Sequence, residues 1–119
     1  MTRYLITFGA HAMDHIASDE MPAVARAAHA VCREMIDAGV FVVSGGLESR
    51  PALVVSGDGT TEQGSPPDAV SGITVIDVTT DDEARAWAAK IATACRCAQE
   101  VRALGYDPEL DAMLRGVTP

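Results

Sequence analysis

Around residue 80, a sequence typical of a strand is followed directly by a sequence typical of the start of a helix. This order predicts a strand followed by a helix in the second half of the chain. Residues 72–78 are rich in isoleucine, valine and threonine, as expected of a buried strand. Thr80 and Glu83 then form a capping box, in which Thr80 caps the first helical turn and Glu83 reaches back. The apolar residues of the predicted helix recur at helical spacing: Ala84, Trp87, Ala88 and Ile91.

The first half of the chain repeats this alternation. Residues 4–8 predict a strand, and a polar loop over 9–19 follows it. A helix is expected over 21–38, because Pro22 suits a first turn and apolar residues recur at helical spacing. Gly39 is a natural stop for this helix, and residues 40–44 predict the next strand, which ends at a Gly-Gly pair that we interpret as a turn.

Shorter elements complete the order. Residues 51–56 predict a strand, a Gly-Asp-Gly turn follows, and residues 60–68 are expected to be an irregular loop. Residues 97–103 predict a closing strand, and a final helix begins at Asp107-Pro108, so that 107–116 form a helical extension. The resulting order predicts one domain over 1–119 of α+β class. Its expected form is a ferredoxin-like, split βαβ fold with an antiparallel sheet.

The length and composition fit a single small domain, and the expected number of helices points to a dimer. The chain has 119 residues, of which 48% are hydrophobic, so it can bury one core. Two helices cover only one face of such a sheet, and a second copy of the chain is the expected cover for the other face. We therefore predict a homodimer.

The net charge and the N-terminal sequence limit the classes of partner and the cellular compartment that we expect. The formal net charge is −8 with no cluster of basic residues, which argues against nucleic acid and anionic membranes as partners. The N-terminal apolar run is too short for a signal-peptide core, and the cysteines are odd in number. A cytoplasmic protein with reduced thiols is expected.

Several segments, taken in order, resemble the YCII-related family and its DGPF-type branch, within the dimeric α+β barrel group. The segments are 3–6 (RYLI), 26–29 (RAAH), 38–40 (AGV), 44–47 (SGGL), 71–78 (SGITVIDV), 82–89 (DEARAWAA) and 100–102 (EVR). The resemblance implies a dimeric α+β barrel with a small-molecule cleft between the first helix and the sheet. It also implies a helix histidine paired with an aspartate after the first strand. One branch of the family is associated with eliminating hydrogen chloride from a chlorinated quinol.

His29 matches the helix histidine of this resemblance, and it is our main catalytic candidate. A histidine at the boundary of an apolar stripe suits a general base near neutral pH, or it simply forms a hydrogen bond across an interface. Arg26, one turn earlier, would bind an anionic substrate or be a solvated charge. Ser44 and Gly45 are the remaining predicted substrate-binding residues.

The sequence departs from the family pattern at two places. The aspartate after the first strand is replaced by Gly9, Ala10 or His11, and the Asp-Gly-Pro-Phe motif is missing. We predict that His11 or Asp14 takes over the role of orienting His29. His11, Asp14 and His15 also have metal-ligand spacing for a helix, but a polar loop is the favoured reading, and no metal is predicted.

The other reactive side chains have structural interpretations. Cys95 and Cys97 are expected to point the same way at the start of a strand, as small buried residues, like Cys32. No residue pattern implies a cofactor. We therefore expect either a cofactor-free acid–base enzyme of elimination or isomerisation type, or a non-catalytic dimeric module that binds a ligand or acts as an accessory. Relatives of this branch are often linked to alternative sigma factors, which fits the second reading.

Overall fold

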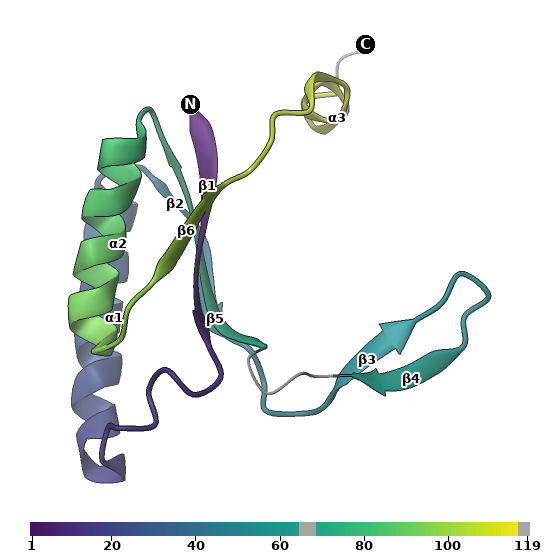
Figure 1. The fold of residues 1–119 in the computed structure, drawn as a ribbon. Helices are drawn as coiled ribbons and strands as arrows, with labels where there is room; N and C mark the ends of the chain where they lie inside the picture. The colour runs from purple at the N-terminus through teal and green to yellow at the C-terminus, as the bar shows by residue number, and fades with distance from the viewer. Residues whose placement is uncertain (65–68, 117–119) are drawn as a thin grey trace.

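The computed structural model describes residues 1–64 and 69–116, and these form an α+β fold around one antiparallel sheet (Figure 1). The sheet contains four strands in the order β2-β5-β1-β6. Its elements are β1 (Thr2–Gly9), α1 (Met21–Asp37), β2 (Phe41–Gly46), β5 (Val70–Val78), α2 (Asp81–Cys95) and β6 (Glu100–Ala103). The remaining elements are a short 3-10 helix (Ser18–Glu20), the strands β3 (Ala52–Val55) and β4 (Thr61–Gly64), and α3 (Pro108–Leu114).

The sheet is built from two β–α–β units that interlock. In the first unit α1 connects β1 to β2, and in the second α2 connects β5 to β6. Each unit leaves a gap of one strand, which a strand of the other unit fills. The predicted α+β class, antiparallel sheet and β–α–β units are therefore confirmed.

Both long helices pack on the same face of the sheet, and the core lies between the two layers (Figure 1). The largest fully buried side chains are Ile6 of β1, Met35 of α1, and Ile76 and Val78 of β5. On α2 most residues that face this core are small, among them Ala84, Ala88 and Ala94, and Ile91 is the large one. Small side chains let the helix approach the sheet closely, so the core is made of aliphatic groups in direct contact.

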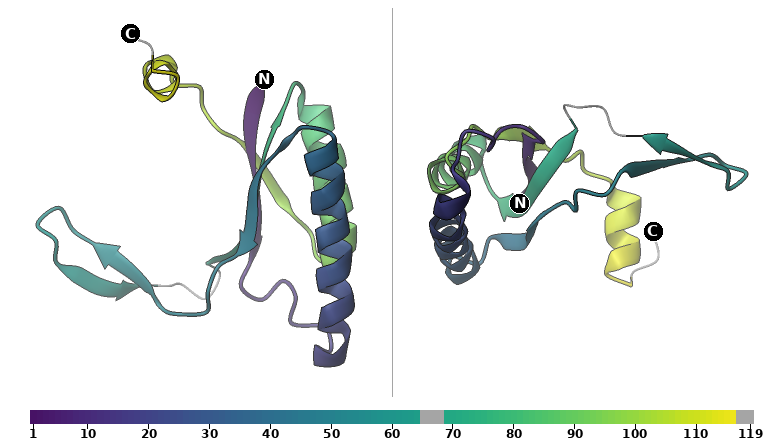
Figure 2. Two further views of the ribbon diagram at one scale, coloured as in Figure 1. Left: turned by 180° about the vertical axis from the view of Figure 1, so that it is seen from behind. Right: turned by 90° about the horizontal axis from the view of Figure 1, so that it is seen from below.

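The opposite face of the sheet carries an apolar strip with charged ends. Strand registers place Leu5 opposite Val75, and Val75 opposite Val43, so these side chains share this face. At one end of the strip, Arg3 and Asp77 form an ion pair with a 2.8 Å Nε–Oδ1 distance. We call this surface the open sheet face, because neither long helix covers it (Figure 2).

Two segments project from the body on the side of the open sheet face (Figures 1 and 2). One is the β3–β4 hairpin, in which Leu53 is 68% exposed, and the other is α3, in which Leu114 is 76% exposed. The radius of gyration is 16.6 Å, whereas a compact chain of this length has about 13.5 Å. The excess reflects the projection of these two segments, whose apolar residues are exposed in the single chain.

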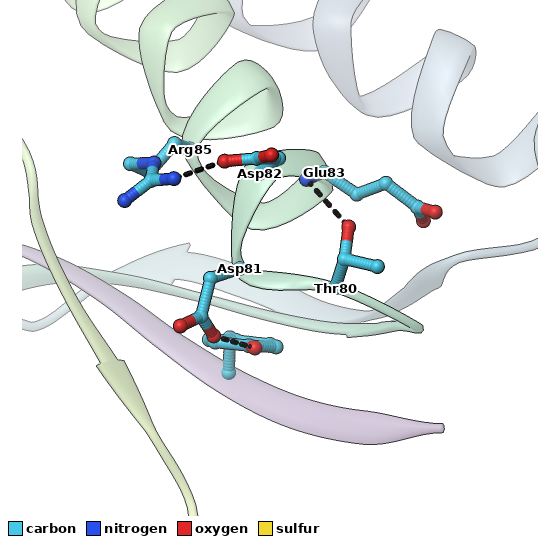
Figure 3. A network of polar contacts seen from close by, with 6 residues as sticks. Thr80, Asp81, Asp82, Glu83 and Arg85 are labelled. Carbon is cyan, nitrogen blue, oxygen red and sulfur yellow. Dashed lines mark hydrogen bonds and ion pairs between the residues drawn. The ribbon is translucent and has the colours of Figure 1, made fainter.

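The helix-start signals in the sequence are confirmed with one difference. The Thr80 hydroxyl accepts a hydrogen bond from the Glu83 N–H at 3.2 Å, as an N-cap should (Figure 3). The Glu83 carboxylate, however, accepts its hydrogen bonds from Thr79, including the hydroxyl at 2.6 Å. Asp107 caps α3 through the Leu110 N–H at 3.0 Å. At the end of α1, Gly39 has φ of +75°, which explains the stop at this residue.

Three local predictions were wrong. Residues 61–64, expected to be loop, form β4, because they pair with β3 across the Gly-Asp-Gly turn despite their polar sequence; residues 65–68 of that predicted loop lie outside the described residues. Gly45 and its neighbour Gly46 extend β2 beside β5 instead of forming a turn. Cys95 ends α2 and Cys97 lies in the connection before β6, so they do not begin a strand.

Within residues 1–64 and 69–116, no helix has the length and apolar character needed to cross a membrane.

Candidate functional site

A cavity of about 280 Å³ lies between α1 and the helix-facing side of the sheet, beside the C-terminal end of β2. Its walls are mainly apolar, and two aromatic rings, from Phe8 and Phe41, contribute to them. The remaining apolar lining comes from Ala28, Val31, Cys32, Met35, Ile73, Ile91 and Cys95. We call this space the α1 cavity. It is the one that contains the predicted catalytic histidine.

His29 lines the α1 cavity from α1. The helix sets this position. Val31 and Met35 belong to the stripe of α1 that is buried in the core, and His29 lies at the edge of that stripe. The residue remains exposed to solvent as well as to the cavity. In the described part of the chain its imidazole makes no hydrogen bond and no ion pair. Both ring nitrogens are therefore free to bind a ligand.

Two hydroxyl groups supply the polar part of the cavity wall. Ser44 of β2 and Thr74 of β5 are opposite each other in the strand register, and their side-chain oxygens are 2.9 Å apart. The Ser44 hydroxyl also donates to the Ile73 carbonyl at 3.2 Å. Thr74 is only 5% exposed. A buried hydroxyl pair at the wall of an apolar space offers a specific hydrogen-bonding point to a ligand.

Gly72 shapes the same cavity by leaving room for an aromatic ring. It lies opposite Phe8 in the β1–β5 register, and the Phe8 ring covers it. A Cβ atom at position 72 would lie 3.0 Å from Phe8 Cδ1 and closer still to two other ring atoms. The glycine therefore fixes where this wall of the cavity stands.

Thiols form the inner end of the cavity. Cys32 and Cys95 both line it, from α1 and α2 respectively. Burial raises the pKa of the Cys95 thiol, and neighbouring Cys97 and Cys32 raise it further. A thiol with a raised pKa is a poor nucleophile, so Cys95 serves as an apolar lining group at neutral pH. All three cysteines are unpaired.

Three of the predicted site residues, His11, Asp14 and Arg26, are not at the α1 cavity. His11 and Asp14 pair with each other, with a 2.8 Å Nδ1–Oδ2 distance, in the loop after β1, and their side chains are 70% and 67% exposed. The structure shows no bond from either to His29. Arg26 lies on the exposed side of α1 and is not among the residues that line the cavity. Ser44 and Gly45, in contrast, do line it together with His29.

Metal binding finds no support in the described ranges. Residues 1–64 and 69–116 contain no group of three or more His, Cys, Asp or Glu side chains placed to hold an ion. The segment with His11 and His15 forms turns, so the helical spacing that would align the two imidazoles is lost.

A second, larger hollow lies outside the core, between α2 and β6. It has a volume of about 610 Å³ and is lined mostly by small residues, including Ala88, Ala92 and Ala103. At one end the Tyr4 hydroxyl donates to Asp81, beside the Asp82–Arg85 ion pair (Figure 3). The bond to Asp81 and burial both raise the pKa of Tyr4. We call this hollow the alanine groove.

Sequence reasoning missed Thr74 and Phe8 as cavity residues. Thr74 carries a signal, because it is a single hydroxyl inside an otherwise aliphatic strand segment. Phe8 carries none that is specific, since an aromatic residue near the end of a strand is ordinary core. What brings both to His29 is the pairing of β1 and β2 with β5, which is not local in sequence.

Comparison with known proteins gives no relative for this chain. No family model matches it, and no curated protein matches it either. The resemblance to the YCII-related family therefore stands on the residues of the sequence.

Proposed function

We propose that this protein is a homodimer that binds a small molecule in the α1 cavity and uses His29 as a general base in an elimination or isomerisation. The observation that carries the proposal is the position of His29. An imidazole free of hydrogen bonds in the described structure faces an apolar cavity whose wall also holds the Ser44–Thr74 hydroxyl pair. A general base needs reach to the substrate and a pKa near the working pH, which an imidazole ordinarily provides.

The lining points to an uncharged substrate. No described Lys, Arg, Asp or Glu side chain lines the α1 cavity, and transfer of an ion into such a space carries a large desolvation cost. The two phenylalanine rings favour a planar or cyclic body, and the hydroxyl pair favours one polar substituent. This replaces the anionic substrate that Arg26 alone would suggest.

The dimer proposal rests on the open sheet face. Leu5, Val43 and Val75 form an apolar strip there, and Val43 is 49% exposed in the single chain. Face-to-face packing of two such sheets, as in the dimeric α+β barrels of the YCII-related family, would bury this strip. The projecting hairpin and α3 lie on the same side and would find packing surface on the second copy. Ferredoxin-like topology supports this arrangement, since the strand order is the one that such barrels use.

Proton abstraction can be tested without knowing the natural substrate. Cyclohexanone is an uncharged ring with one carbonyl, and its α-protons exchange for deuterium in D₂O when a base removes them. We expect the protein to accelerate this exchange, measured by proton NMR, and His29→Gln to abolish the acceleration. Arg26→Gln on the same helix is the matched control and should exchange as wild type does. Equal rates for wild type and His29→Gln would reject the catalytic proposal.

A second candidate is a non-catalytic ligand-binding or accessory dimer. The observation in its favour is that His29 has no carboxylate partner in the described structure, while the nearest predicted acid, Asp14, is bonded to His11. Under this alternative, cyclohexanone binds with equal affinity to wild type and His29→Gln, and neither protein accelerates its exchange.

A further inference from the structure

Among residues 1–64 and 69–116, β6 pairs with β1 alone, because it lies at the end of the sheet. The other side of its backbone has no strand partner there. The Leu104 N–H donates to the Arg3 carbonyl at 2.8 Å, which fixes the alternation of hydrogen bonds along the strand. Glu100 and Arg102 turn their backbone groups toward β1, so Val101 and Ala103 turn theirs outward. An exposed row of this kind is a template for another strand.

The two edges of the sheet differ in protection. The β2 edge has a bulge between Phe41 and Val43, a device that interrupts pairing with a further strand. β6 pairs in continuous register and contains neither proline nor lysine. The alanine groove lies beside it, so the space next to this edge on the helix side is open.

The sequence of β6 is complementary to itself. If a second copy pairs antiparallel about a two-fold axis at Val101, the N–H and C=O of each Val101 meet the C=O and N–H of the other. The same register sets Glu100 opposite Arg102 of the partner subunit, and the reverse pair follows by symmetry. Within one chain these side chains already form an ion pair with a 3.3 Å Nε–Oε1 distance. Pairing would therefore create a cluster of four charges, two on each strand, in which each charge has neighbours of opposite sign.

The position of these charges in the register strengthens the match. Glu100 and Arg102 would form pairs without backbone hydrogen bonds between them, and such pairs bring side chains closest together. Charged residues on an edge strand usually repel a copy of the same edge. In the register centred on Val101, the Glu–Val–Arg order sets opposite charges across from each other, which stabilises the pair of strands. Pairing centred on Glu100 or on Arg102 would set like charges opposite each other, which destabilises it.

We infer that β6 pairs with β6 of a second copy, so that two sheets become one continuous sheet. The small residues of α2 at the alanine groove, Ala88, Ala89 and Ala92, permit close approach of the second copy on the helix side. This contact uses the backbone edge of β6, whereas the proposed face-to-face dimer uses the apolar strip of the open sheet face. Glu100 and Arg102 project at the β6 margin of that face, since Arg102 is opposite Leu5. With both contacts the protein is a tetramer.

Charge exchange tests the register directly. The variants are Glu100→Arg, Arg102→Glu and the double exchange of both, and their molar masses are measured by light scattering and sedimentation at matched concentrations. The two side chains are 68% and 63% exposed in the single chain, so the substitutions leave the core unchanged. Each single variant makes the four charges of this cluster all of one sign, and we expect association through β6 to weaken about tenfold or more. The double exchange restores alternation and should restore association.

The mass of the wild type separates the two interfaces. If it is a tetramer that falls to a dimer in the single variants, both contacts exist. If it is a dimer that falls to a monomer and the Val101 N–H is protected in that dimer, only the edge contact exists. Wild-type mass that the single variants do not change overturns the inference and leaves the face-to-face dimer standing. A double exchange that behaves like the single variants overturns the proposed register.

Amide exchange supplies a residue-level readout. The N–H groups of Val101 and Ala103 point away from β1, so in an unpaired chain they exchange with solvent quickly. Pairing protects both, and Glu100→Arg should remove that protection while leaving Arg102, which bonds to β1, protected. Fast exchange of Val101 in the associated wild type would also overturn the inference.

Discussion

Replacing Gly72 by alanine should destabilise the protein, because the space beside its Cα is filled by the ring of Phe8. The two residues are paired across β1 and β5, and the ring lies on the glycine. A Cβ atom at position 72 would stand 3.0 Å from Phe8 Cδ1 and nearer to two further ring atoms. The methyl group can be accommodated only if the ring leaves its position, which is a wall of the α1 cavity.

Two opposing contributions set the size of the effect. Forcing an extra methyl group into a packed site typically costs about 1–3 kcal/mol. Replacing a strand glycine by alanine returns about 0.5–1 kcal/mol, because glycine loses more conformational freedom on folding. Because two ring atoms would lie far inside van der Waals contact, the cost falls in the upper part of its range. The expected net loss for Gly72→Ala is then about 1–2 kcal/mol in the free energy of unfolding. For a domain of this size the melting temperature should fall by about 4–8 °C.

Urea unfolding at one fixed protein concentration measures the loss, since association contributes to apparent stability. Gly46→Ala is the matched control, because its Cβ would meet nothing closer than the Ser71 carbonyl at 3.9 Å. In a Phe8→Ala background the penalty at position 72 should disappear, which a double-mutant cycle detects. The reasoning is refuted if Gly72→Ala matches the Gly46→Ala control, or if its penalty persists without the Phe8 ring.

Two further predictions concern the ends of elements. Thr80→Ala removes the N-cap of α2 and should lower the stability by about 1 kcal/mol, measured by thermal unfolding. Thr93→Ala in the same helix is the control and should cost little, because the Thr93 hydroxyl only bonds the backbone carbonyl one turn back. Equal losses in the two variants would argue against the cap. The hydrogen bond from Arg3 lowers the pKa of Asp77 in the folded protein. The pair therefore stabilises the fold fully at pH values above the ordinary aspartate pKa of about 3.9. This contribution is lost as the pH falls below about 3.9 toward the lowered pKa of Asp77. Since both side chains are partly exposed, this contribution is about 1 kcal/mol or less. Arg3→Gln should remove that part of the acid dependence in urea titrations at pH 7 and pH 3, and an unchanged difference between the two pH values would contradict it.

The long elements were predictable because their signals are local. Thr80 begins α2 and Gly39 follows α1 for reasons contained within one helical turn, a capping hydroxyl and a positive φ. The apolar period of α1 also placed His29 at the edge of its buried stripe. β4 was missed because its polar residues become a strand only through pairing with β3.

The site was predictable only in part, and the missing part depends on strand pairing. His29, Ser44 and Gly45 were expected together and do line one cavity. Thr74 and Phe8 join them through the β5 registers, which a local pattern does not specify. Arg26 is exposed and does not line the cavity, because helical spacing makes it a surface neighbour of His29 without turning it toward the α1 cavity.

The most direct test of the proposed function is to locate where an uncharged ring binds. Phenol is titrated into the isotope-labelled protein, and the methyl signals of Ala28, Val31 and Ile91, which line the α1 cavity, are followed by NMR. The account predicts that these signals shift together and saturate with phenol, and that benzoate, which carries a charge, leaves them unmoved. Shifts centred instead on Ala92 and Ala103 of the alanine groove, or equal shifts with benzoate, would contradict it.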